Sequence, residues 1–221
     1  MRATLRPLPA LTPYVLVVIV HLVSIVIGAS SLVAATKPLL MPALLVGVLL
    51  AMPARRSPAM LWLSLALACS WLGDVLLGDP GALGFLLGMV AFGLAHIAYI
   101  ALYLGPARTR RVPPRALVFV IWYAALVGLL APHLGSLLVP VLIYGLVLGA
   151  AAAVSLGSTT LVAIGAGVFL VSDTLLGLDR FLPGLGDLAL DAAIMLTYCA
   201  GQGLIALGVV VLARARAAAA V

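Results

Sequence analysis

The sequence predicts an all-α, polytopic integral membrane protein with eight transmembrane helices. Of the 221 residues, 66% are hydrophobic and 8% are charged, and the mean hydropathy of +1.34 lies far above that of water-soluble domains. A spanning helix needs about 20 apolar residues to cross a hydrocarbon core about 30 Å thick. The chain contains several such runs, separated by short polar or Pro/Gly-rich breaks, and their lack of alternation excludes a transmembrane β-barrel.

The breaks divide the chain into eight expected helices. In order, these cover residues 13–30, 38–52, 59–78, 82–104, 116–131, 134–153, 160–177 and 189–212. The second and fifth are the shortest, so an alternative with seven helices, in which one of them is a re-entrant segment, stays open. The loops are too short for a soluble domain, and we expect residues 1–221 to form a single transmembrane helical domain.

The first expected helix begins shortly after Arg2 and Arg6. Basic residues followed by an apolar run also fit a secretion signal, for which the "VAAT" of residues 33–36 would be the cleavage site. That alternative stays open, although removal of this segment would leave an odd number of helices.

Basic residues collect on alternate loops, as the positive-inside rule requires. With eight helices, ten of the 12 fall on one side: Arg2, Arg6, Arg55, Arg56, Arg108, Arg110, Arg111, Arg115, Arg214 and Arg216. Only Lys37 and Arg180 fall on the other. We therefore expect both termini in the cytoplasm and the chain in the cell's plasma or inner membrane. The net charge of +6 then reflects topology, and nucleic acid is not an expected partner.

The second expected helix begins with a cation in "ATKPLL". Thr36 is a suitable N-cap and Pro38 a suitable first-turn residue, which would place Lys37 where the helix dipole is already positive. This position favours a nearby anion, either an intramembrane aspartate or a lipid phosphate. A lysine that extends to water at the interface is the alternative.

The third and seventh expected helices each contain a carboxylate, Asp74 and Asp173. The other acidic residues lie in or beside the non-cytoplasmic loops: Asp79, Asp179, Asp187 and Asp191. Asp74 and Asp173 each precede by four residues a glycine that is expected to end the helix, about 6 Å below that end. An ionisable residue at such depth is a functional-site hypothesis. The matching "DVLLG" and "DTLLG" segments also fit a parallel duplication of a four-helix unit.

Other polar side chains inside the expected helices are candidates to surround these carboxylates, because an unpaired polar group in hydrocarbon is costly. They are His96, Tyr99 and Tyr103 in the fourth helix, Tyr144 in the sixth, and Tyr198 and Gln202 in the eighth. Any one of them could be a satisfied core side chain. As a set they favour an arrangement in which these side chains converge on a cavity. We expect Asp74 and Asp173 to face one cavity that opens toward the non-cytoplasmic half, with Lys37 at its mouth.

Two desolvated carboxylates close together suit hydrolysis, because one can be protonated as an acid while the other is ionised as a base. The sequence has no Ser-His-Asp order, G-x-S-x-G or H-E-x-x-H motif and no Cys or His cluster, so no metal or cofactor is expected. A proton-coupled transporter or lipid flippase, with the aspartates as proton or substrate sites, is the alternative. A purely structural subunit would leave the buried charges unexplained.

Several segments together resemble the lysoplasmalogenase, or YhhN-like, family of polytopic membrane proteins. They are "KPLL" from Lys37, "SWLGDVLLG" from Ser70, "FGLAHIAYI" from Phe92, the lone Tyr144, "VFLVSDTLLGLDRF" from Val168 and "TYCAGQGLI" from Thr197. The resemblance implies an eight-helix enzyme that hydrolyses the vinyl ether of lysoplasmalogens to a fatty aldehyde and a glycerophospho-headgroup. It implies that Asp74 and Asp173 are the acid–base pair. The substrate-binding residues would be Lys37, His96, Tyr99, Tyr144, Ser172, Tyr198 and Gln202.

Overall fold

The computed structural model describes residues 7–79, 81–182, 184 and 188–220, and the regular elements in these ranges are all helical. Arg2, Arg6 and Asp187, which the sequence predictions also used, lie outside the described residues. The α-helices are α1 (Pro7–Ala10), α2 (Thr12–Val26), α3 (Ser30–Thr36), α4 (Leu40–Ala51), α5 (Pro58–Leu76), α6 (Ala82–Leu104), α7 (Val118–Leu130), α8 (Leu138–Ser155), α9 (Thr160–Phe181) and α10 (Leu188–Ala219). The 3-10 turns are η1 (Lys37–Leu39), η2 (Pro114–Leu117), η3 (Ala131–His133) and η4 (Gly135–Leu137).

Seven helical stretches of the described chain are long and apolar enough to cross a membrane: Ser30–Ala51, Pro58–Leu76, Ala82–Leu104, Pro114–His133, Gly135–Ser155, Thr160–Phe181 and Leu188–Ala219. The shorter apolar helix α2, of 15 residues, precedes them. The predicted all-α, polytopic architecture is therefore confirmed. One detail differs, because Ser30–Ala51 and Pro114–His133, which correspond to the second and fifth expected helices, span 22 and 20 residues, and α2 is the short element.

The ends of the helices follow local chemistry. Ser57 caps α5 by accepting a hydrogen bond from the Met60 amide at 3.2 Å, and Pro58 occupies the first turn. Helix α10 ends at Ala219, seven residues beyond the predicted residue 212. Its last turns extend past the neighbouring helices, where Arg214 donates to the Ala51 carbonyl and Arg216 to the Pro106 and Arg108 carbonyls. These bonds and the alanine-rich tail explain the extra length.

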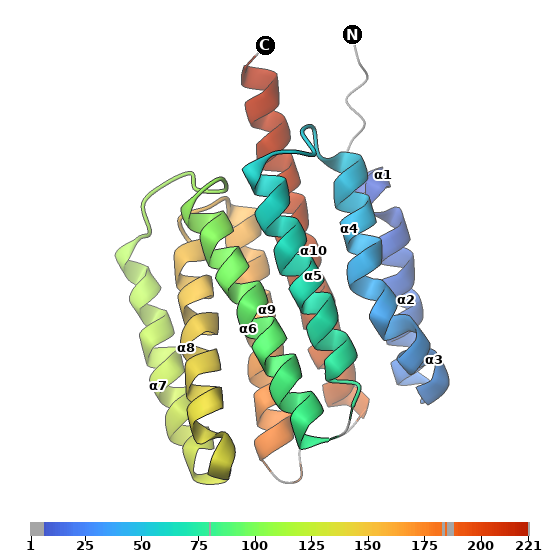
Figure 1. Cartoon of the computed structure of the whole chain (residues 1–221), viewed down its shortest axis with the longest axis vertical. Helices are drawn as coiled ribbons and strands as arrows, with labels where there is room; N and C mark the ends of the chain where they lie inside the picture. The colour runs from blue at the N-terminus through green and yellow to red at the C-terminus, as the bar shows by residue number, and fades with distance from the viewer. Residues whose placement is uncertain (1–6, 80, 183, 185–187, 221) are drawn as a thin grey trace.

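Two tightly packed hairpins form the centre of the bundle, α5 with α6 and α9 with α10 (Figure 1). Glycine permits the close approach of α9 and α10. A Cβ on Gly201 would lie 2.8 Å from the Phe169 amide nitrogen and 2.9 Å from the Gly165 carbonyl oxygen. Small residues at helix contacts are typical of membrane bundles, in which backbone proximity replaces the hydrophobic effect between helices.

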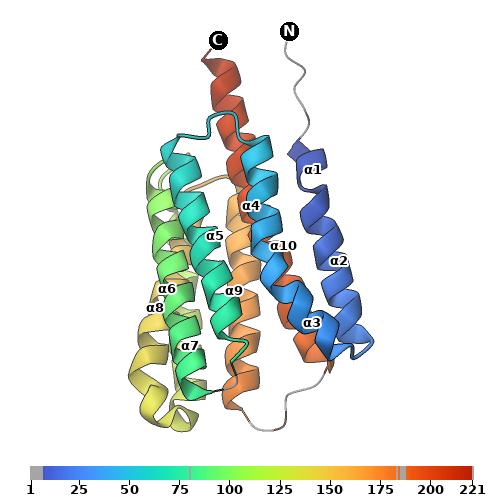
Figure 2. The same cartoon turned by 45° about the vertical axis from the view of Figure 1, so that its right-hand side comes forward.

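The remaining helices flank this centre on two sides. Helices α7 and α8 lie on one side and α2 to α4 on the other, as Figures 1 and 2 show. Helix α7 is peripheral, and Leu130 is its only buried residue. Helix α1 begins and α10 ends at the same end of the bundle, where the α4–α5 and α6–α7 connections also lie (Figure 1). The α2–α3 connection and the start of α10 lie at the opposite end (Figure 2).

Candidate functional site

Asp74 lies in the last turn of α5 and is 4% exposed. The Tyr198 hydroxyl of α10 donates a 2.7 Å hydrogen bond to its Oδ2. Asp74 lines an open cavity of about 590 Å³ between the end of α2, α3, η1, the end of α5 and the start of α10. Lys37 and Asp191 also line this cavity, which we call the polar cavity. It holds charges of both signs beside apolar walls.

Lys37 lies within the second membrane-spanning stretch, which corrects the prediction that it begins this helix. The stretch starts at Ser30, and Lys37 opens the 3-10 turn η1 between α3 and α4. Thr36 is not an N-cap. Its Oγ1 donates to the Leu32 carbonyl at 2.6 Å and lies 2.8 Å from His21 Nδ1. Because Pro38 lacks an amide hydrogen, the break falls at this turn, and Lys37 lines the polar cavity from it.

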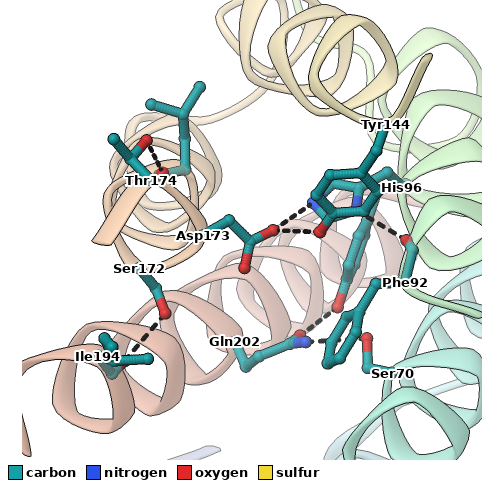
Figure 3. A network of polar contacts seen from close by, with 11 residues as sticks. Ser70, Phe92, His96, Tyr144, Ser172, Asp173, Thr174, Ile194 and Gln202 are labelled. Carbon is teal, nitrogen blue, oxygen red and sulfur yellow. Dashed lines mark hydrogen bonds and ion pairs between the residues drawn. The ribbon is translucent and has the colours of Figure 1, made fainter. Parts of the chain in front are cut away.

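Asp173 lies on α9, with a side chain 7% exposed. The Tyr144 hydroxyl of α8 donates to its Oδ2 at 2.5 Å, and His96 Nε2 of α6 lies 3.9 Å from the same oxygen (Figure 3). The predicted depth is wrong for this residue, because α9 continues through Gly177 to Phe181. Asp173 therefore lies about 12 Å from the helix end. A glycine does not end a helix where hydrocarbon offers no water to the freed carbonyls.

Asp173 borders a second cavity, narrow and about 60 Å³ in volume. Apart from Asp173, Tyr144 and two glycines, its walls are apolar side chains of α5 to α9: Leu77, Phe85, Met89, Phe92, Leu126, Leu130, Val141, Leu148, Leu176 and Phe181. We call it the apolar cavity. Its apolar lining suits hydrocarbon rather than a charged headgroup.

A chain of aromatic contacts links the surroundings of the two carboxylates. Phe92, Phe169 and Tyr198 pack edge to face, with ring centroids 5.4–6.3 Å apart. Phe92 borders the apolar cavity, and the Tyr198 hydroxyl reaches Asp74. Instead of one shared cavity, the two carboxylates border different cavities, which are lined at the end of α5 by Asp74 and by Leu77 just after the helix.

A third polar cluster joins α5, α6 and α10 without reaching either carboxylate. The Tyr99 hydroxyl donates to Gln202 Oε1, and Gln202 Nε2 donates to Ser70 Oγ at 3.0 Å (Figure 3). Ser172 donates to the Ile194 carbonyl at 2.9 Å and so ties α9 to α10. Among the described residues, no group of three or more His, Cys, Asp or Glu side chains could hold a metal ion.

The YhhN family model matches residues 30–209 of this chain, which include all of these groups except His21. The chain belongs to the YhhN family. It is 38% identical over 158 residues to the lysoplasmalogenases of Mycobacterium bovis and Mycobacterium tuberculosis, a match that covers 66% of this chain and 59% of each relative. It is 35% identical over 144 residues to human lysoplasmalogenase TMEM86B, covering 64% of this chain and 60% of the relative. The chain thus spans about three fifths of the length of these relatives. No solved structure is detectably similar to it.

The predicted site residues of this YhhN-family chain divide into three groups. Lys37 and Asp74 line the polar cavity, and Tyr198 is bonded to Asp74. Tyr144 and Asp173 line the apolar cavity, with His96 beside them. Tyr99, Ser172 and Gln202 instead hold helices together.

Sequence reasoning missed His21 and Tyr14 of α2. His21 is fully buried, and its Nδ1 contacts Thr36 next to Lys37. The Tyr14 hydroxyl donates to the Cys199 carbonyl at 2.7 Å and ties α2 to α10. The sequence did contain a signal that could have identified them, because both are polar residues inside the first apolar run.

Proposed function

We propose that this chain is a membrane-embedded hydrolase that cleaves the vinyl ether bond of lysoplasmalogen-type lysophospholipids. Family membership and relatives named lysoplasmalogenase support the proposal. The observation that carries it is that two carboxylates at membrane depth each border a cavity, and that one cavity is polar and the other apolar. Asp74 borders the polar cavity and Asp173 the apolar one. A lysophospholipid has the matching parts, one charged headgroup and one hydrocarbon chain.

The two cavities suggest how such a lipid would bind. The headgroup fits the polar cavity of about 590 Å³, where Lys37 would face its phosphate. The hydrocarbon chain fits the apolar cavity, which would open around it. Asp74, in the last turn of α5, lines the polar cavity, while Leu77, just after that turn, and Phe92 line the apolar cavity. The vinyl ether links headgroup and chain, so it would lie at this turn with one aspartate toward each side.

Hydrolysis of a vinyl ether requires a proton for one carbon of the double bond and a water for the other. In the proposed reaction, protonated Asp173 gives its proton to the chain-side carbon of the double bond, leaving an oxocarbenium ion. Water adds to the cationic carbon and loses a proton, which gives a hemiacetal. Asp74 assists the transfer of the hemiacetal hydroxyl proton to the glycerol oxygen, and the carbon–oxygen bond breaks. The products are a fatty aldehyde and a glycerophospho-headgroup with a free hydroxyl, so the sum consumes one water.

A substrate panel tests this function. The full-length chain, purified in detergent, is incubated with matched lysophospholipids that carry a 1-alkenyl, 1-alkyl or 1-acyl chain, and products are identified by mass spectrometry. We expect fatty aldehyde from the 1-alkenyl lipid alone, because alkyl ethers cannot form the oxocarbenium ion by protonation at carbon. Fatty acid from the 1-acyl lipid, or no product from any lipid, would contradict the proposal.

A proton-coupled transporter or lipid flippase is the second candidate function. It is favoured by the break in the second span at η1, because interrupted helices near a charged residue are typical of transporter binding sites. Proteoliposomes that contain the chain would distinguish the two functions. Lipid scrambling or proton flux without cleavage of the 1-alkenyl lipid would support the transporter.

A further inference from the structure

The ring of His96 is held in one orientation by its own helix. Nδ1 lies 2.8 Å from the Phe92 carbonyl oxygen, one turn earlier on α6 (Figure 3). A carbonyl oxygen can only accept a hydrogen bond, so Nδ1 carries the hydrogen. In the neutral ring Nε2 is then unprotonated, and its lone pair points away from α6. Histidines that act as bases are commonly oriented in this manner, by a bond from the other ring nitrogen.

The lone pair of His96 Nε2 is buried without a partner. His96 is 2% exposed, and its Nε2 has no hydrogen-bond partner among the described residues. An unsatisfied buried polar atom destabilises the folded state, so such an atom calls for a functional explanation.

Asp173 is the carboxylate that this lone pair faces. His96 Nε2 and Asp173 Oδ2 are 3.9 Å apart, too far for a direct hydrogen bond but close enough for one water to bond to both. Within the described chain this is the only pair of a basic side chain and a carboxylate within 4.0 Å. His21 also has an unpartnered Nε2, yet no described carboxylate lies within that distance of it. Tyr144 donates to the same Asp173 oxygen and limits the carboxylate's movement.

We propose that His96 is the base of the reaction and works with Asp173 as a single proton-cycling unit. Asp173 gives its proton to the vinyl carbon and becomes ionised. His96 Nε2 then accepts a proton from the attacking water while the water oxygen bonds to the oxocarbenium carbon. The imidazolium returns that proton to Asp173 across the 3.9 Å gap, and both groups regain their starting states. This inference rests on the proposed hydrolase function and assigns within it the residue that activates water.

The geometry favours His96 over Asp74 for this step. Asp74 borders the other cavity, and its Oδ2 already accepts the Tyr198 hydroxyl. A base must lie within hydrogen-bond reach of the water that attacks the oxocarbenium carbon, which is next to the carbon protonated by Asp173, or one water away. His96 meets this requirement, because its Nε2 lies 3.9 Å from Asp173 Oδ2.

Two substitutions of His96 separate a base from a structural contact. His96→Asn keeps a donor for the Phe92 carbonyl but removes Nε2, whereas His96→Gln places a polar, non-basic amide near the Nε2 position. If His96 is the base, both variants lower kcat about 100-fold with little change in KM. If His96 only supplies a polar contact, His96→Gln restores activity. His133→Asn is the matched control, because His133 is an exposed histidine of η3, outside both cavities.

Azide provides a readout that a structural role would not change. Azide is already an anion and adds to an oxocarbenium ion without a base, giving an α-azido ether that mass spectrometry identifies. We expect added azide to restore substrate consumption in His96→Asn but not in Asp173→Asn, which cannot form the cation. Near-normal turnover by His96→Asn, or no azido ether from it, would overturn the role of His96. Wild-type release of aldehyde in the same assay shows that the proposed function itself holds, so the two failures are distinguishable.

Discussion

At the scale of single residues, each intramembrane aspartate accepts a hydrogen bond from a tyrosine of a different helix. The Tyr198 hydroxyl donates to Asp74, and the Tyr144 hydroxyl donates to Asp173. A carboxylate in hydrocarbon without such partners costs several kcal/mol. One phenol hydroxyl satisfies only one of a carboxylate's acceptor sites, so each aspartate keeps acceptor capacity toward its cavity. That remaining capacity is what a catalytic carboxylate needs.

Replacing either aspartate by asparagine tests this requirement. Asparagine keeps the size of aspartate and can still accept the tyrosine hydrogen bond, but it cannot exchange a proton in the cycle. We expect Asp74→Asn and Asp173→Asn each to lower aldehyde release about 100-fold while the folded protein persists. The double variant should be scarcely worse than either single one, because the two aspartates act on successive steps and the slower step limits turnover.

Asp79→Asn is the control for these variants. Asp79 is exposed just beyond α5 and accepts the Gly81 amide at 2.9 Å, a bond that asparagine can keep. Its turnover should equal that of the wild type. Aldehyde-release kinetics and size-exclusion profiles in detergent give both readouts. Near-normal turnover by an Asp74 or Asp173 variant would mark that residue as a structural partner only.

At the scale of elements, the break between α3 and α4 directs Lys37 into the polar cavity. His21 of α2 donates to Thr36 Oγ1, because the Thr36 hydroxyl hydrogen is used on the Leu32 carbonyl. This chain of bonds holds the end of α3 against α2, one residue before Lys37. A buried histidine in the first helix thereby positions a lysine of the second.

Substitution of His21 should therefore have the same kind of kinetic effect as substitution of Lys37, a higher KM with an unchanged kcat. Lys37→Met removes a phosphate partner that acts equally in the ground and transition states, so KM rises and kcat is spared. His21→Leu should raise KM about fivefold, the equivalent of one hydrogen bond of about 1 kcal/mol. His21→Asn, which keeps a donor toward Thr36, should recover most of the loss. A fall in kcat with unchanged KM for His21→Leu would contradict this positioning role.

The contact between α9 and α10 offers a second test, with two glycines two residues apart on α9. A Cβ on Gly165 would lie 2.7 Å from the Ile205 amide nitrogen of α10, whereas one on Gly167 meets nothing within 4 Å. Gly165→Ala should destabilise the protein by about 1–3 kcal/mol through overpacking. Gly167→Ala should stabilise it by about 0.5–1 kcal/mol, the usual helical preference for alanine. Thermal unfolding in detergent measures both, and a Tm shift of the same sign for both would contradict the close approach.

At the scale of the whole molecule, charge is gathered at one end of the bundle. The α4–α5 and α6–α7 connections and the end of α10 lie there (Figure 1), and they carry Arg55, Arg56, Arg108, Arg110, Arg111, Arg214 and Arg216. The polar cavity lies toward the opposite end, beside the α2–α3 connection. If the basic end is cytoplasmic, a headgroup enters from the non-cytoplasmic half.

Reporter fusions test this orientation. Fusions after Arg111 and after Arg216 should both report the cytoplasm, since these residues lie at the basic end. A fusion within residues 182–188, between α9 and α10, should report the other side. A non-cytoplasmic signal from the Arg216 fusion would show that the orientation is reversed or that α2 does not cross the membrane.

The sequence by itself determined the helical architecture and the two carboxylates. In hydrocarbon every backbone amide must bond within its own segment, so apolar runs of sufficient length can only be helices. A charge inside such a run is costly enough to stand out, and Asp74 and Asp173 were found for that reason. His96 and Tyr144 were found on the same ground, and Lys37 was found as a cation at the expected start of a helix. Each lies beside one of the two carboxylates or in its cavity.

Only the tertiary structure decided how these residues are grouped. Helical spacing gives the face of a side chain but not the neighbour that its face meets. The family resemblance implied that Ser172 binds substrate, and in the structure its hydroxyl bonds the backbone of α10. The division into two cavities depends on how Phe92, Phe169 and Tyr198 pack together from three helices. The interior place of Lys37 depends on the bond between His21 and Thr36, across the α2–α3 connection. Contacts between residues far apart in the chain are set by packing, and packing is a property of the assembled bundle.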